Sequence, residues 1–261
     1  RHGRSTASNL ENHCSAKTDP LRGSTSPTVP TVGLRKCGNL PPSMRSKTCV
    51  IFAAGEWCSM DLIQPYLESH PTVLACDGAL TLCLEHGIVP DAVIGDMDSA
   101  SNESIKRYAA LGGEVHRRDG QDNHDLSKAL VFAEDGGCTS CVVVGATGGD
   151  REHEWANLLS CAAATMNIKC LGDEQIYSFF RSGESHSIEI SSGQKFSLFA
   201  LPLAHGVTLK GAQYTLKKET LNMGSRGLHN IAIASTLHLD FAEGRLMLLK
   251  TRPSSKAGER I

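Results

Sequence analysis

Three aspartates occur where short apolar segments end, and their spacing suits them to binding a metal ion. Asp77 follows the apolar run Thr72–Cys76, and Asp96 and Asp98 follow the run Ala92–Gly95. Residues two apart on an extended chain point the same way, so the carboxylates of Asp96 and Asp98 repel each other unless a cation lies between them. Hard oxygen ligands with open positions beside them suit Mg²⁺ that carries a polyphosphate. The alternative interpretation is that these residues are solvated acids in turns.

A second polar segment, QDNHDLSK at residues 121–128, leads into a predicted helix. Asp122 and Asp125 are three residues apart, so one helical turn could bring both carboxylates to the same side. Asp122 or Asn123 could instead cap the helix. The sequence leaves these two interpretations open.

A third segment, GATGGDREHE at residues 145–154, has the composition of a glycine turn between a strand and a helix. Its amides can approach a phosphate closely, and a helix N-terminus favours anions. A nicotinamide-binding fingerprint is excluded because no glycine follows at the required offset and the segment lies in the middle of the chain.

Apolar, β-rich segments alternate with helical ones in the part of the chain that contains these clusters. We expect strands at 48–54, 72–76, 92–95 and 141–145, and helices at 60–69, 79–86, 102–111, 124–133 and 152–166. This alternation predicts an α/β domain at residues 48–175, with a mostly parallel sheet covered by helices on both faces, in three layers. Ligands bind outside the carboxyl ends of strands in such a sheet, which is where the aspartates lie.

The chain from residue 176 onward has no further helical pattern. We expect strands at 195–201, 207–210, 213–216, 231–241 and 245–250, with a hairpin turn at 242–245. Residues 176–252 are therefore predicted to form a small antiparallel β-sandwich domain.

The two ends of the chain differ in composition from this body. Residues 1–47 hold five of the ten prolines and have a net charge of +6, which leaves −8 for the remainder. This segment lacks the apolar content of a core and is predicted to be disordered, either as a linker or as an organellar transit segment. Residues 253–261 are predicted to be a disordered tail.

Composition also limits the function classes. Apolar residues make up 40% of the chain and charged residues 21%, which is typical of a globular protein. The net charge of −2 argues against nucleic-acid binding, and the longest apolar runs are too short to cross a membrane. Without a visible secretory signal, the ten cysteines are expected to be free thiols in a cytoplasmic protein. The acidic body favours binding of phosphates through a metal ion.

The three clusters, in this order and followed by β-strands, resemble the thiamine pyrophosphokinase family over about residues 48–250. The matching stretches are ACDGA at 75–79, PDAVIGDMDS at 90–99, QDNHD at 121–125, GATGG at 145–149 with His153 and Asn157, and TLKG at 208–211 through Asn230. The resemblance implies a Mg²⁺-dependent transferase that moves a diphosphoryl group from ATP to the hydroxyl of thiamine. It also implies a homodimer with the active site at the interface.

The resemblance assigns roles to individual residues of this sequence. The residues that would bind metal and phosphates are Asp77, Asp96, Asp98 and Asp125. Those that would make further contacts with ATP are Thr147, Gly148, Gly149 and Arg151. Those that would contact thiamine are Gln121, Ser225, His229 and Asn230. Asp98, Gln121 and Asp125 are the candidate catalytic residues, with either aspartate as the base. Thiamine would be held partly by the β-sandwich of the partner subunit.

Three positions depart from the family pattern. His124 stands where the family usually has Thr, His229 where it has Ser, and Asp150 follows the glycines where it has Arg. Neighbouring carboxylates are expected to hold His124 in its protonated form. Alternatively, the chain is a catalytically weakened relative of the family that acts as a sensor of thiamine diphosphate or of a nucleotide.

Overall fold

The structure, a computed structural model, describes residues 46–118 and 124–252. Residues 1–45 and 253–261 lie outside the described residues, as do Gln121 and Asp122. The predictions of disorder at both ends and the interpretation of Asp122 as a helix cap therefore stay predictions.

The first half of the described chain builds a parallel sheet in the order β4-β3-β2-β1-β5-β6. Its strands are β1 (Thr48–Phe52), β2 (Thr72–Cys76), β3 (Ala92–Gly95), β4 (Glu114–Arg117), β5 (Ser140–Val144) and β6 (Asn167–Leu171). The helices are α1 (Met60–Leu67), α2 (Leu80–Glu85), α3 (Asn102–Ala110), α4 (Asp125–Asp135) and α5 (Arg151–Ala163), with the short 3₁₀ helix η1 (Asp77–Ala79) after β2. The strands and helices predicted for this half are all present, whereas the strand predicted at 213–216 begins only at Leu216 and the one predicted at 231–241 is divided into two. The strands β4 and β6 were not predicted, because they are short and mix polar with apolar residues.

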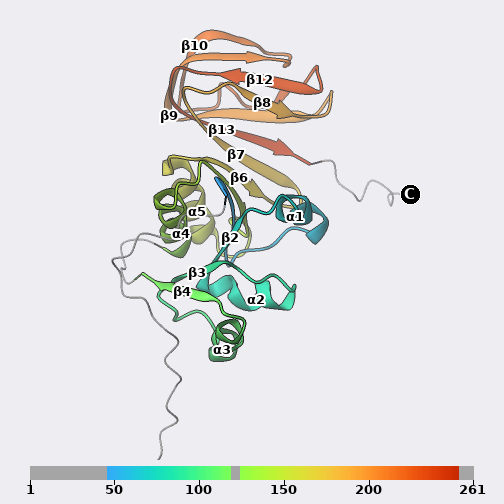
Figure 1. Ribbon diagram of the computed structural model, residues 1–261. Coiled ribbons are helices and arrows are strands. Elements are labelled where there is room, and N and C mark those ends of the chain that lie inside the picture. The colour runs from blue at the N-terminus through green and yellow to red at the C-terminus, as the bar shows by residue number, and fades with distance from the viewer. Residues whose placement is uncertain (1–45, 119–123, 253–261) are drawn as a thin grey trace, which may run out of the picture. The chain divides into compact units, whose positions relative to one another are not determined.

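Helices cover both faces of this sheet, as predicted (Figure 1). Alternate residues of β1 point to opposite faces: Cys49 and Ile51 pack in the same core as residues of α4 and α5. Val50 and Phe52 pack in a second core with residues of α1, α2 and α3. Because both faces of the central strands are buried, their sequences are continuously apolar, which is what made them recognisable.

Antiparallel strands continue the same sheet beyond β6. They are β7 (Gln175–Arg181), β8 (His186–Glu189), β9 (Lys195–Lys210), β10 (Leu216–Asn222), β11 (Asn230–Ile231), β12 (Thr236–Asp240) and β13 (Glu243–Thr251). β7 pairs antiparallel with β6, and the order continues β7-β13-β9-β12-β8, with β10 and β11 also paired to β9. The α/β fold with a C-terminal antiparallel region is thus confirmed. The division into two domains at residue 175 stays a prediction.

The long strand β9 organises the antiparallel region in a way that local patterns did not predict. Two separate strands were expected at 195–201 and 207–210, but β9 runs through both as one strand. The expected hairpin at 242–245 is wrong. Its two flanking strands pair with different parts of β9 and not with each other: β12 with Thr208–Lys210, and β13 with residues 196–205. A third core lies in this region, with Leu198, Leu209 and Leu237 among its members.

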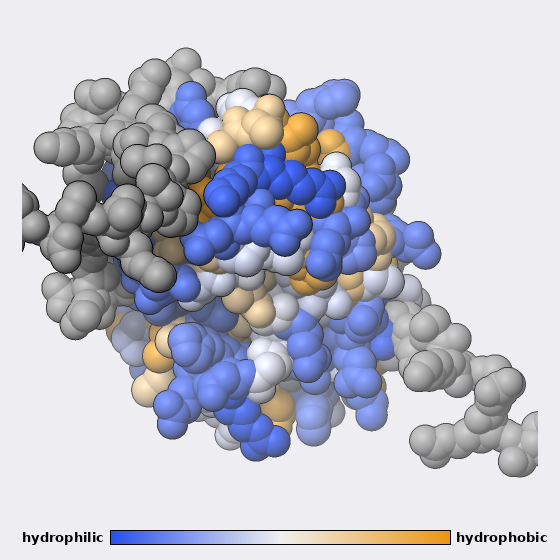
Figure 2. All heavy atoms as spheres, turned by 90° about the horizontal axis from the view of Figure 1, so that it is seen from below, coloured by the Kyte–Doolittle hydropathy of each residue, from blue (hydrophilic) through white to orange (hydrophobic). Residues whose placement is uncertain are grey.

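The surface view matches this internal distribution of apolar residues. Hydrophilic residues cover most of the face seen in Figure 2, with hydrophobic residues in small areas between them. Among the helices of residues 46–118 and 124–252, none is long and apolar enough to span a lipid bilayer.

Tyr108 of α3 joins the loops that flank β3 and β4. Its side chain is fully buried, and its hydroxyl donates to the carbonyl oxygen of Pro90 (3.0 Å) and accepts from the N–H of Glu114 (3.2 Å). A side chain at Gly113 would place its Cβ 2.2 Å from the Tyr108 ring, so this approach requires glycine. The phenol thereby positions the edge of the sheet next to β3.

We predict that Tyr108→Phe lowers the free energy of unfolding by about 1–3 kcal/mol, because the buried carbonyl group of Pro90 and the partly buried N–H of Glu114 lose their partner. Urea unfolding followed by circular dichroism measures this. Tyr214→Phe is the matched control, since that side chain is 65% exposed. Equal effects of the two substitutions would show that the Tyr108 hydroxyl does not stabilise the fold.

Candidate active site

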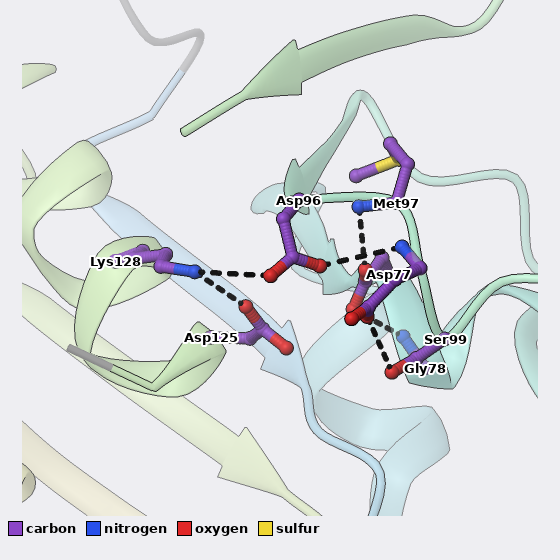
Figure 3. Close-up of polar contacts among 8 residues, drawn as sticks. Asp77, Gly78, Asp96, Met97, Ser99, Asp125 and Lys128 are labelled. Atoms are coloured by element: carbon purple, nitrogen blue, oxygen red, sulfur yellow. Dashed lines mark hydrogen bonds and ion pairs between the residues drawn. The ribbon is translucent and has the colours of Figure 1, made fainter. Parts of the chain in front are cut away.

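The three aspartates at the ends of β2 and β3 form one acidic cluster, which we define as Asp77, Asp96 and Asp98. The two strands are parallel neighbours, so their carboxyl ends meet at the same edge of the sheet. One carboxylate oxygen from each residue lies within 4.8 Å of the others. Figure 3 shows the side chains of Asp77 and Asp96 in this arrangement. This is the convergence that the sequence predicted for these three residues.

Asp77 is the buried member of the acidic cluster. Its side chain has no exposed surface, and its two oxygens accept from the N–H groups of Gly78 (2.7 Å) and Met97 (2.8 Å). A Cβ at Gly95 would lie 2.5 Å from the Asp77 carboxyl carbon, so the last residue of β3 has to be glycine. Burial, and then repulsion by Asp125, raise the pKa of Asp77 to about 6. A cation beside this carboxylate would oppose both effects.

Asp96 and Asp98 complete the acidic cluster at the surface. The N–H of Asp98 donates to Oδ1 of Asp96 (3.3 Å), which bends the chain so that both carboxylates lie close to Asp77. Asp98 is exposed and accepts a hydrogen bond from the hydroxyl of Ser99 (3.1 Å). The cluster therefore has one fixed, buried ligand and two more accessible ones.

Lys128 is a residue of this site that sequence analysis did not single out. Only 8% of its side chain is exposed, and its ammonium lies 3.1 Å from Oδ1 of Asp125 and 3.9 Å from Oδ2 of Asp96 (Figure 3). Its position three residues after Asp125 on α4, among apolar neighbours, was the available signal. A buried lysine needs such partners, because desolvating an unpaired ammonium is costly.

Asp125, the fourth predicted metal ligand, has a different environment from the acidic cluster. It is the first residue of α4 and pairs with Lys128. Its carboxylate still lies near enough to Asp77 to raise the pKa of Asp77. Asp125 therefore links Lys128 to the acidic cluster without belonging to the group of three close oxygens.

A cavity of about 290 Å³ lies beside Asp125 and the glycine turn. Its lining residues come from the ends of β1 and β2, the N-terminus of α4 and the start of α5: Ala53, Ala54, Gly55, Cys76, Gly78, Ser99, His124, Asp125, Leu126, Gly148, Gly149, Asp150, His153 and Asn157. His153 and Asn157 of the family pattern are thus brought to the same cavity as Asp125. Gln121 lies outside the described residues.

The prediction that His124 is held protonated is wrong. The side chain is half-buried, and its Nε2 lies 2.8 Å from the hydroxyl of Ser160 and 3.3 Å from the carbonyl oxygen of Ala156. Burial lowers the pKa of His124, and this effect exceeds the opposing attraction of Asp125. The neighbouring carboxylates are evident from the sequence, but the packing of the ring against α5 is not.

The glycine turn is already held by carboxylates. Oε2 of Glu154 accepts from the N–H of Gly148 (3.0 Å), and Asp150 caps α5 by accepting from the N–H groups of Glu152 and His153. These acids occupy amides that could otherwise bind a phosphate. Arg151 is exposed at the first turn of α5, and Thr147 is half-buried in the glycine turn.

Of the residues predicted to contact thiamine, the three that the structure describes, Ser225, His229 and Asn230, lie in the antiparallel region and do not line the cavity beside Asp125. Ser225 and His229 are exposed. Asn230 is buried, and its side-chain amide bonds both the N–H (3.0 Å) and the carbonyl oxygen (2.8 Å) of Tyr214, as a neighbouring strand would. Asn230 therefore has a structural role in this fold, and its contact with thiamine stays a prediction.

Comparisons with known proteins point to one family. Residues 63–171 match the family model described as "Thiamin pyrophosphokinase, catalytic domain". The thiamine pyrophosphokinase of Bacillus subtilis (strain 168) is 25% identical over 213 residues, which cover 78% of this chain and 99% of that protein. Thiamine pyrophosphokinase 2 of Oryza sativa subsp. japonica is 28% identical over 151 residues, covering 52% of this chain and 56% of the relative.

Solved structures of the same name share the fold. The Bacillus subtilis thiamine pyrophosphokinase superposes with a TM-score of 0.67 at 24% identity, covering 78% of this chain and 98% of that one. The thiamin pyrophosphokinase of Candida albicans has a TM-score of 0.62 at 14% identity, covering 81% and 95%.

The environment of His124 generates a prediction about stability and pH. Because burial lowers its pKa, the folded chain binds fewer protons than the unfolded chain as the pH falls below the usual histidine range. His124 therefore costs stability on acidification, and that cost disappears as the pH rises. His124→Thr should flatten the dependence of unfolding free energy on pH between about 5 and 7.

Urea unfolding at several pH values, in the presence of a chelator, measures this slope. His238→Thr is the matched control, because that histidine is exposed on a strand. An unchanged slope in His124→Thr, or an equal change in the control, would contradict the burial of a neutral ring.

Proposed function

This chain belongs to the thiamine pyrophosphokinase family, and we propose that it transfers the diphosphoryl group of ATP to the hydroxyl of thiamine, which gives thiamine diphosphate and AMP. The observation that carries the proposal is the acidic cluster, with its three carboxylate oxygens within 4.8 Å at the carboxyl ends of parallel strands. In sheets of this type, ligands bind at that edge. The family comparisons supply the identities of the two substrates.

The acidic cluster fits Mg²⁺ by the chemistry of its donors. All three ligands are carboxylate oxygens, which a hard divalent cation prefers, and Asp98 is exposed enough to leave coordination positions open. The raised pKa of Asp77 indicates that the buried charge lacks sufficient compensation from the protein's own groups. When bound by Asp77, Asp96 and Asp98, Mg²⁺ would neutralise phosphate charge.

The N-terminus of α4 is the part of the cavity best suited to a phosphate. His124 occupies the N-cap position but makes no side-chain hydrogen bond to the amides of the first turn. These amides and the helix dipole favour an anion beside the acidic cluster. Since Glu154 and Asp150 already hold amides of the glycine turn, Thr147, Gly149 and Arg151 would contact outer parts of ATP.

The chain's own groups mainly align the reactants and neutralise the charge of the phosphates, as is usual in phosphoryl transfer. The hydroxyl of thiamine attacks the β-phosphorus of ATP, AMP leaves, and a carboxylate takes the hydroxyl proton. Asp98 and Asp125 are the two candidates for this base, and Asp125 is already paired with Lys128. Gln121 would help to position the substrate.

Thiamine would be held by Ser225, His229 and Asn230 of a second copy of the chain. In one copy these residues are absent from the lining of the cavity beside Asp125, so a homodimer offers a way to bring them to it. Large apolar side chains are exposed near them: Tyr214, Met223, Leu228 and Ile233. On α5, Trp155 and Leu159 are 67% and 61% exposed and lie four residues apart on one helical face. These two exposed apolar surfaces are suited to an interface.

The alternative of a catalytically weakened sensor is not favoured. The three close carboxylates are present, and the departures at His124 and Asp150 are accommodated by hydrogen bonds within the fold. A cytoplasmic location, with a transit segment at residues 1–47 as the alternative, is part of this proposal and rests on composition.

Removing one charge from the acidic cluster should abolish catalysis and leave the fold intact. We predict that Asp96→Asn and Asp98→Asn each lower turnover by about 100-fold or more, because phosphate charge loses its compensation. The assay mixes purified protein with thiamine, ATP and Mg²⁺ and quantifies thiamine diphosphate and AMP. Asp61→Asn, an exposed substitution in the first turn of α1, is the control. Rates within about threefold of the parent for both variants would remove these residues from the site.

Charging the exposed apolar surface around Ser225 should separate the subunits. We predict that the parent sediments as a dimer at micromolar concentration and that Met223→Glu shifts it toward monomer, since Met223 is 70% exposed in the free chain and an interface would bury it. Activity should fall in parallel with the dimer fraction. Leu111→Glu, at the end of α3 and 54% exposed, is the control. A fully active monomer would contradict a shared site.

A further inference from the structure

A second cavity, which we call the α1 groove, lies between α1 and the antiparallel strands. Its volume is about 620 Å³, within the range of small-molecule sites. It is lined by Leu62, Tyr66, Leu171, Ile176, Glu189, Ile190, Ser191, Gln194, Ser235, Thr236, Lys250 and Arg252. Figure 1 shows the C-terminal end of β13, which carries Lys250, on the side of the molecule where α1 lies. The α1 groove shares no lining residue with the cavity beside Asp125.

Three cations gather at the α1 groove. Lys250 and Arg252 line it directly, and Lys169 contacts Tyr66 of the lining, with its ammonium 3.2 Å from the phenol oxygen and 5.3 Å from the ring centre. The ammonium of Lys250 donates to the backbone carbonyl oxygen of Glu189 (2.8 Å). Burial, and then the charge of Lys169, lower the pKa of Lys250. Positive charges are thus held close together at the α1 groove, where they are partly shielded from water.

Carboxylates offset the charge of this group only in part. Among residues 46–118 and 124–252, none of Lys169, Lys250 and Arg252 forms an ion pair with a carboxylate. Glu189 is the acidic residue in the lining; its charge opposes the lowering of the Lys250 pKa, but Lys250 bonds its backbone and forms no ion pair with its side chain. An anion in the α1 groove would relieve the repulsion between the cations and gain charge-assisted hydrogen bonds.

Apolar side chains line one part of the α1 groove, and the polar Ser191, Gln194, Ser235 and Thr236 line another. Leu62 comes from α1, Leu171 and Ile176 from the paired strands β6 and β7, and Ile190 from the end of β8. The ring of Tyr66 adds an aromatic surface beside them. A purely inorganic anion would leave this surface in contact with water, so the lining favours a ligand that has an apolar part as well as a charged one.

We propose that the α1 groove binds a small organic phosphate, a phosphate monoester whose apolar or aromatic group packs on Leu62, Tyr66 and Ile176 while Lys250 and Arg252 hold the phosphate. This site has the opposite charge to the acidic cluster. Its ligand therefore needs no divalent cation, unlike a phosphate at Asp77, Asp96 and Asp98. That difference allows the two sites to be measured separately.

The test is calorimetric titration of the full chain with phenyl phosphate, in a chelator that removes divalent metal. The parent should bind one molecule, and inorganic phosphate and phenol should each bind at least about tenfold more weakly, because each lacks one half of the recognition. Lys250→Gln and Arg252→Gln should each weaken phenyl phosphate by about tenfold through loss of a charge-assisted contact. Lys217→Gln, at an exposed position of β10, is the matched control and should bind as the parent does.

Asp96→Asn separates the groove from the proposed catalytic function. It should bind phenyl phosphate as tightly as the parent, even where its turnover is lost. Unchanged affinity in both groove variants, or an equal loss in Lys217→Gln, would overturn the proposal. So would binding that requires Mg²⁺ and disappears in Asp96→Asn, which would place the ligand at the acidic cluster. If Lys250→Gln fails to melt cooperatively, Arg252→Gln decides the outcome, because Arg252 follows the last residue of β13.

Discussion

The buried carboxylate of Asp77 is the constraint on which the rest of the site depends. Two backbone N–H groups, from Gly78 and Met97, hold it at the end of β2, and its environment raises its pKa to about 6. These bonds fix the path of the chain after β3 and so the positions of Asp96 and Asp98. The close approach also requires the absence of a side chain at Gly95. A site that buries a carboxylate in this way is organised to receive positive charge.

Negative and positive side chains gather at separate sites in this molecule, the acidic cluster and the α1 groove. The buried ammonium of Lys128, on α4, offsets the negative charges of Asp125 and Asp96. Carboxylates accept the hydrogen bonds of amides in the glycine turn and at the start of α5. In the proposed function, polyphosphate would therefore bind between the N-terminus of α4 and a metal ion held by the acidic cluster. The cations of the α1 groove lie apart from this cavity and lack carboxylate partners within the described residues. A chain with a net negative body can therefore still hold an anion directly, at a place where local charge and not the average decides.

The antiparallel region depends on β9, which pairs with β13, β12, β10 and β11 along its length. The side-chain amide of Asn230 contributes to this region by bonding the backbone of Tyr214. Exposed apolar residues around Ser225 lie on this part of the fold, while the acidic cluster belongs to the parallel sheet. The proposed dimer combines the two, because one copy supplies the metal and phosphate site and the other supplies the contacts to thiamine.

The sequence by itself determined the parallel sheet, its helices and the convergence of Asp77, Asp96 and Asp98. These follow from local patterns: strands buried on both faces are continuously apolar, and polar residues directly after them lie at one edge of the sheet. Tertiary structure alone decided the pairing of β9 with strands distant in the sequence, the burial of Lys128 and the lowered pKa of His124. It also brought together Tyr66 and Lys250 in the α1 groove. Each of these depends on which residues pack together from separate elements, and desolvation and charge at such contacts are set by neighbours that no local spacing specifies.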